Sequence, residues 1–162
     1  MSDQPKLTLT TARQAVVSVL AGAVVCGMLI VAVEPTGNFL PVVPWTVPAL
    51  LAILAAAVVI YSRILRKKIE EKRVSAQESV TALVLGKAMV ATGALFAGGH
   101  IVYVARYLQL AQAPMSAQRV VNGLLTLVAA LLLAGAGSLL ERACVVRDDD
   151  PEHPGGSTAS PA

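Results

Sequence analysis

Four long apolar runs constrain the fold of this chain more than any other feature of its sequence. A helix needs about 20 mostly apolar residues to cross a bilayer, and three of the runs reach about that length. The second run is shorter, but Trp45 before it suits a membrane interface and Arg63 after it can snorkel. The runs are Ala15 to Val33, Val47 to Ser62, Ser79 to Ala105 and Val120 to Leu140.

Composition decides whether these runs lie in a protein core or in lipid. The 162 residues are 56% hydrophobic and 14% charged, whereas soluble domains are about 45–50% apolar and about 25% charged. We therefore predict an all-α integral membrane protein, a bundle of four transmembrane helices over residues 1–147. The spans are expected at about 15–33, 46–63, 79–105 and 119–141.

Capping patterns mark where two of the helices begin. The stretch from Thr11 to Gln14 has the form of a capping box before the first run, and the stretch from Ser75 to Glu78 has it before the third. The first run could also be a signal peptide, but ten apolar residues follow the cleavage-like Ala21 to Ala23. An uncleaved anchor fits that length better.

Basic residues indicate the orientation, because Lys and Arg are enriched on the cytoplasmic side of membrane proteins. Two segments on the other side carry only Arg106 and Arg119. We expect a multi-pass plasma-membrane protein with both termini in the cytoplasm and the lipid bilayer as its first partner. The ten cytoplasmic basic residues are Lys6, Arg13, Arg63, Arg66, Lys67, Lys68, Lys72, Arg73, Arg142 and Arg147.

The polar segments suggest no further domain. The segment "RILRKKIEEKR" reads as a solvated helix that continues the second span, and no nucleic-acid role is expected because it lacks interleaved aromatic residues. Residues 148–162 form an acidic tail rich in Pro, Gly and Ser, which predicts disorder. Cys26 and Cys144 lie too far apart along the membrane normal to form a disulfide.

Lys87 is the one charge inside an apolar run. Helical side chains lean toward the helix N-terminus, so its stem can carry the ammonium back to the cytoplasmic headgroups. A sharper hypothesis is a structural ion pair between Lys87 and Glu141, fastening the third span to the fourth. The remaining alternative is that Lys87 binds an anion or a partner protein.

Polar and aromatic residues also gather toward the outer ends of the spans. One interpretation is an aromatic belt with snorkelling arginines, and the other is an interaction surface for a partner or lipid. The residues proposed for that surface are Trp45, His100, Arg106 and Arg119.

No arrangement of residues points to catalysis, a cofactor or a metal. No acid lies inside a run, which weakens a proton-coupled transporter. Ser138 and His100 are expected at opposite faces, so they cannot form a catalytic dyad. Carboxylates of the tail are the only metal ligands to consider, and a flexible tail lacks preorganisation.

Small residues recur at four-residue spacing and allow helices to approach closely. The ridges are Ser18/Gly22/Cys26 and Ala23/Gly27 on the first span, Gly93/Ala97 and Ala94/Gly98 on the third, and Ala130/Ala134/Ser138 on the fourth. Their spacing does not say which helices they join, or whether the contact lies within one chain.

Three stretches together resemble a known family: "LPVVPW", "LVLGKAMVATGALFAGG" and "LERACVV". With four short-looped spans, the chain is similar to the DUF3180 family of small actinobacterial membrane proteins over roughly residues 7 to 147. The resemblance implies the four-span architecture and no assigned activity. It singles out Pro44, Trp45, Lys87, Glu141, Arg142 and Cys144, although the family often continues with a basic residue where this chain has Val145.

These observations favour a non-catalytic structural or accessory role, acting through an unknown membrane protein partner or through self-association. The alternative is an oligomeric pathway for a small solute or anion, with Lys87 as the intramembrane charge.

Overall fold

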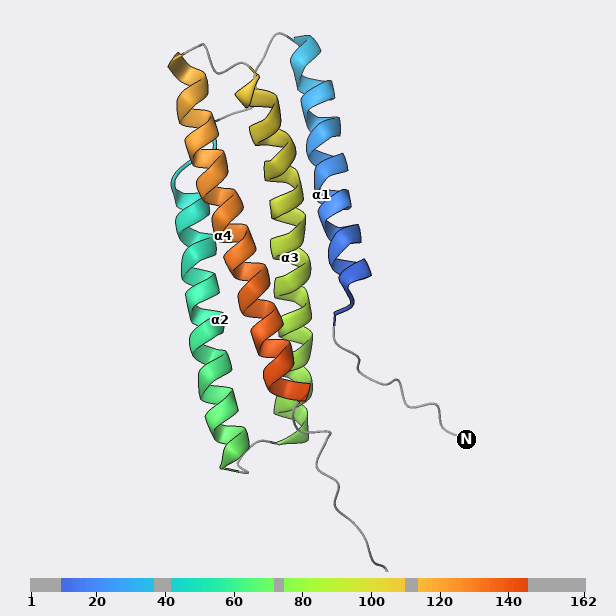
Figure 1. The fold of residues 1–162 in the computed structure, drawn as a ribbon, viewed down its shortest axis with the longest axis vertical. Helices are drawn as coiled ribbons and strands as arrows, with labels where there is room; N and C mark the ends of the chain where they lie inside the picture. Colours follow the sequence, from blue (N-terminus) through green and yellow to red (C-terminus); the bar gives the residue numbers. More distant parts are fainter. Residues whose placement is uncertain (1–9, 37–41, 72–74, 110–113, 146–162) are drawn as a thin grey trace, which may run out of the picture.

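The computed structural model describes residues 10–36, 42–71, 75–109 and 114–145. These residues form four long helices and one short 3-10 helix, η1 (Glu34–Thr36), which follows the first long helix (Figure 1). The long helices are α1 (Ala12–Val33), α2 (Thr46–Glu70), α3 (Ala76–Leu108) and α4 (Pro114–Val145). All four are long and apolar enough to cross a membrane, which confirms the predicted all-helical, multi-span architecture.

Two helices, α1 and α3, begin where the capping patterns predict, whereas α4 begins at Pro114, five residues before the predicted start of its span. The Thr11 hydroxyl accepts a hydrogen bond from the Gln14 amide at 3.4 Å, and the Gln14 side chain accepts one from the Thr11 amide at 3.1 Å, completing a capping box. The Ser75 hydroxyl caps α3 by accepting from the Glu78 amide at 3.2 Å. These bonds satisfy backbone donors that a helix leaves unpaired in its first turn.

The described helices lie in the order α1, α3, α4, α2, so α2 is separated in space from both of its sequence neighbours, α1 and α3 (Figure 1). Contacts join α1 to α3, α3 to α4 and α4 to α2, whereas α1 touches neither α2 nor α4. The predicted bundle is thus an open row, with α3 and α4 in its middle. Leu133 and Leu140 of α4 are fully buried, in a core that they share with Leu51 and Leu65 of α2.

The helices run roughly parallel or antiparallel (Figure 1), and the two edges of the row where they begin and end differ in chemistry. We call the end with Arg13, the Arg63–Lys68 segment and Arg142 the basic end, and the end with Trp45, Arg106 and Arg119 the aromatic end. At the basic end α2 continues without a break to Glu70, as predicted for "RILRKKIEEKR". The chain before α1 and the end of α4 meet there, because Thr10 bonds to Glu141. The predicted tail, 148–162, lies outside the described residues.

Candidate functional site

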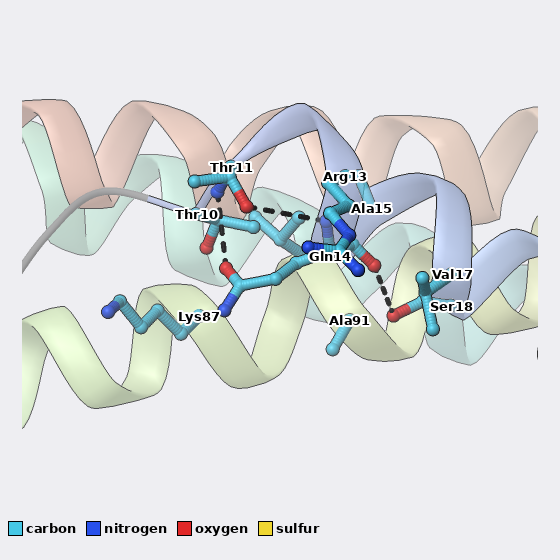
Figure 2. Close-up of a pocket in the computed structure, with 10 residues that line it drawn as sticks. Thr10, Thr11, Arg13, Gln14, Ala15, Val17, Ser18, Lys87 and Ala91 are labelled. Carbon is cyan, nitrogen blue, oxygen red and sulfur yellow. Dashed lines mark hydrogen bonds between the residues drawn. The ribbon is translucent and has the colours of Figure 1, made fainter.

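Lys87 lies on α3 beside the first turn of α1. It shares the wall of a cavity with Thr11 and Gln14, so this lysine is level with the place where α1 begins. Figure 2 shows its side chain running along α3 toward the basic end, away from the threonines. The extended stem agrees with the expected snorkelling, in which methylenes lie on apolar surface and the ammonium reaches the polar boundary.

Glu141 is buried on α4, with 2% of its surface exposed. Its Oε2 accepts a hydrogen bond from the Thr10 backbone amide at 2.8 Å, and its Oε1 accepts one from the Thr10 hydroxyl. Its Cγ packs where a side chain on Gly86 would lie. The carboxylate therefore fastens the chain just before α1 to the end of α4.

The hypothesised ion pair between Lys87 and Glu141 is not formed in this structure. Among the ion pairs between described residues, none involves either side chain. Both carboxylate oxygens instead accept from Thr10, and Lys87 extends along its own helix. A backbone amide carries no sequence pattern, so the residues alone could not reveal this competitor.

A second carboxylate fastens the other end of α1. Glu34, in η1, accepts two hydrogen bonds from Arg106 of α3, from Nε at 2.8 Å and from Nη2 at 3.1 Å. This bidentate geometry suits a planar guanidinium. The hydrogen bond from Arg106 lowers the pKa of the Glu34 carboxyl, because it favours the charged form.

Aromatic side chains stack along one face of α3 toward the aromatic end. The ring centroids of Tyr103 and Tyr107 are 4.7 Å apart, and those of His100 and Tyr103 are 6.2 Å apart. The Arg119 guanidinium of α4 lies 5.0 Å from the Tyr107 ring centroid, a cation–π distance. His100 Nδ1 is 2.9 Å from the Phe96 carbonyl oxygen on its own helix.

The four residues of the expected interaction surface thus have different surroundings. Arg106 and Arg119 contact groups of their own chain, and His100 is half-buried. Trp45 is 58% exposed at the start of α2. The structure brings three of these residues to the aromatic end of α3 and α4, and the interaction surface stays a prediction.

Asn122 is a buried polar residue whose role the sequence did not indicate. Its side-chain amide donates to the Val43 carbonyl at 2.9 Å, which ties the segment before α2 to α4. Only 1% of Asn122 is exposed, and its Oδ1 has no hydrogen-bond partner among the described residues. The asparagine orders the connection that leads into α2.

Glycines make the closest helix approaches. A Cβ added at Gly22 of α1 would lie 1.9 Å from the Leu95 carbonyl oxygen, and one at Gly98 of α3 would lie 2.0 Å from that of Val19. The ridges predicted from the sequence include both glycines. At the other interface Gly86 of α3 faces Gly137 of α4 in the same way, and the four-residue pattern missed this pair.

An apolar groove of about 410 Å³ runs between α1, the segment before α2, and α3. Its lining includes Cys26 and Leu29 of α1, Val43, and Phe96 and His100 of α3. In the described part of the chain, no three His, Cys, Asp or Glu side chains gather in a way that could hold a metal ion. Ser138 donates to the Gly135 carbonyl at 2.8 Å, so its hydroxyl is engaged within α4.

A family model described as "Protein of unknown function (DUF3180)" matches residues 15–148, which include all four long helices except the first turn of α1. No curated protein and no solved structure matches the chain.

Proposed function

The chain belongs to the DUF3180 family, and from its geometry we propose that it is an accessory protein of the plasma membrane that binds another membrane protein through α1. The family description assigns no activity, so the proposal depends on how the helices are packed. The observation that carries it is a pair of small residues on α1, of which the glycine has open space around it.

That pair is Ala23 and Gly27. They lie four residues apart, the spacing that lets two helices approach closely in a membrane. A Cβ added at Gly27 would meet nothing within 4 Å, whereas Gly22 is in tight contact with α3. The chain uses Gly22 for its own packing, whereas Gly27, with the small Ala23 one turn before it, has room to receive a helix from a second protein.

The position of α1 in the row supports this role. α1 packs against α3 alone, and of its residues only Gly22 and Ile30 are buried. Lipid tails can cover the remaining apolar surface, so exposure by itself requires no partner. A helix that is attached on one side still offers a partner more access than α3 or α4, which are flanked on both sides.

Membrane placement follows from the polar residues at the two ends. On each helix, a polar or aromatic residue stands on either side of the apolar stretch, and the two lie 18 to 22 positions apart in sequence. That separation is about 27–33 Å at 1.5 Å per residue and matches a hydrocarbon layer of about 30 Å. Lys87 then lies at the boundary of that layer rather than inside it. The bounding pairs are Arg13/Glu34, Trp45/Arg63, Lys87/Arg106 and Arg119/Glu141. We assign the basic end to the cytoplasm on the positive-inside rule.

The alternative, an oligomeric solute or anion pathway with Lys87 as the intramembrane charge, receives less support. Close backbone contacts fill the interface between α3 and α4, where Gly93 faces Ala130 and Ala134. Lys87 points toward the basic end rather than along the interface. A pathway would therefore have to form between chains.

Crosslinking in native membranes, followed by purification, tests the proposal. We expect Gly27→Leu to abolish a reproducible crosslinked complex while leaving the fold intact, because nothing lies within 4 Å of that position. Gly135→Leu on α4 is the matched control, since this glycine is also open. Differently tagged copies separate self-association from a second protein. Equal amounts of complex with the unmodified chain, Gly27→Leu and Gly135→Leu would refute a role for α1.

A further inference from the structure

A cavity of about 570 Å³ opens between the start of α1 and α3 at the basic end (Figure 2). It lies on the opposite half of α1 from the Ala23/Gly27 ridge and takes no part in the proposed helix contact. Its lining comes from two short segments, Thr10 to Ser18 and Lys87 to Ala91.

The lining changes from polar to apolar along both helices. Thr10 and Thr11 precede Val17 on the α1 side, and Lys87 precedes Val90 on α3. Both helices run in the same direction, away from the basic end. The cavity therefore has a polar rim at the basic end and an apolar floor deeper in the row. A ligand that fits such a cavity has a polar head and a hydrocarbon chain.

The rim is cationic. Arg13 and Lys87 both line the cavity, and within the described ranges neither forms an ion pair. Glu141 lies near the rim, but its carboxylate accepts from Thr10. Gln14 is held by its bond to Thr11. Two cations against the one carboxylate of Glu141 leave the rim with a net positive charge, which is complementary to an anion such as a phosphate.

Depth identifies the source of that phosphate. Lys87 lies 19 residues before Arg106, about 28 Å along α3, so the rim lies at one boundary of a hydrocarbon layer of about 30 Å. Phospholipid headgroups occupy that level. Figure 2 shows the Lys87 side chain running along α3, with its ammonium displaced toward the basic end and away from the labelled residues of α1. A headgroup at that level would meet the ammonium.

We propose that this cavity binds one anionic phospholipid of the cytoplasmic leaflet. Arg13 and Lys87 hold the headgroup phosphate, and an acyl chain lies against Val17 and Val90. The lipid would fill the space beside the first turn of α1.

Native mass spectrometry of the full chain, titrated with phosphatidylglycerol, tests this site. A basic residue near the surface contributes about 1 kcal/mol to anionic-lipid binding, so we expect Lys87→Met and Arg13→Gln each to weaken binding about fivefold and the double variant about thirtyfold. Arg66→Gln is the matched control, because Arg66 is a cation of the same end that pairs with Glu70. It should change the affinity less than twofold.

Three further measurements decide the outcome. Lys87→Arg should retain the affinity, which also shows that the position tolerates substitution. Binding of phosphatidylcholine as tight as that of phosphatidylglycerol would overturn the proposal, because the headgroup charge would then be irrelevant. Displacement of the lipid by millimolar inorganic phosphate would overturn the assignment to a lipid in favour of a free anion. An unchanged affinity in the folded double variant would overturn the site itself.

Discussion

Two carboxylates fasten the two ends of α1, and they do so by different chemistry. Glu141 is buried and accepts from a backbone amide and a hydroxyl of Thr10. Glu34 is partly exposed and pairs with the Arg106 guanidinium. The first depends on hydrogen bonds in a dry site, where an unmet group is costly, and the second on a charged pair that solvent can reach.

Replacing Glu141 should loosen the start of α1. Glu141→Ala removes the acceptor of both Thr10 donors, and we expect a loss of about 1–3 kcal/mol in the free energy of unfolding. Unfolding in a titration of dodecyl sulfate against mild detergent measures this value. Glu70→Ala is the control, because Glu70 belongs to an exposed pair with Arg66 that is worth about 0–1 kcal/mol. Equal losses in both variants would contradict the role assigned to Glu141.

Acid should weaken the attachment at the other end. The hydrogen bond from Arg106 lowers the pKa of Glu34 in the folded protein. A lowered pKa contributes stability that is present above the unfolded pKa and is lost as the pH falls through the folded one. We expect thermal stability in detergent to fall on acidification and Glu34→Gln to make that fall shallower. A variant with the pH profile of the unmodified chain would show that the pair contributes no measurable stability.

Glycines bring α1 close to α3, and α3 close to α4. The sequence predicted the four helices well, because length, hydropathy and capping are local properties. It also marked Gly22 and Gly98 as residues of close approach. It could not say that Gly22 packs on Leu95 and Gly98 on Val19, or that Gly86 meets Gly137, because a small residue permits contact with any helix that presents a close-packing surface.

Filling the contact between α1 and α3 should destabilise the fold. A Cβ at Gly22 would lie 1.9 Å from the Leu95 carbonyl oxygen, so Gly22→Ala must push the two backbones apart. We expect a loss of about 1–3 kcal/mol, the range for overpacked sites, in the same detergent titration. Gly27→Ala on the same helix has open space around it and should have little effect. A loss from Gly27→Ala as large as that from Gly22→Ala would contradict this packing.

The interface between α3 and α4 allows a second comparison on one helix. Gly137 and Gly135 of α4 are two residues apart, but a Cβ at Gly137 would lie 2.8 Å from the Gly86 carbonyl oxygen and one at Gly135 would meet nothing within 4 Å. Gly137→Ala should destabilise the protein. Gly135→Ala should be neutral or stabilising, since alanine favours a helix by up to about 1 kcal/mol over glycine. The two substitutions should therefore shift the unfolding midpoint by different amounts, and identical shifts would refute the contact.

The whole molecule is an open row rather than a closed bundle. Its order, α1, α3, α4, α2, pairs α1 with α3 and α2 with α4, and of the consecutive helices only α3 and α4 pack together. Hydropathy predicted four spans, and the same-side placement of the chain before α1 and the end of α4 agrees with an even number of crossings. The order of the row and the surroundings of Lys87 depend on which apolar faces meet, and the apolar runs look alike on all sides.

The basic end should face the cytoplasm and the aromatic end the outside of the cell. With Cys26 and Cys144 replaced by serine, we introduce single cysteines at Lys68 of the basic end and at Gln109 after α3. A membrane-impermeant maleimide added to intact cells should label Gln109→Cys and leave Lys68→Cys unlabelled until the cells are permeabilised. The reverse pattern would place the basic end outside the cell.

The row also has a consequence for how the protein is made. Among the described long helices, α1 contacts α3 only and α2 contacts α4 only, so neither α1 nor α2 has its packing partner until α3 and α4 are synthesised. Each must enter the lipid as a solitary segment, and tertiary assembly waits until the second half of the polypeptide is synthesised. A nascent chain halted after α2 would consist of two unassociated helices, exposed to membrane chaperones and to proteases.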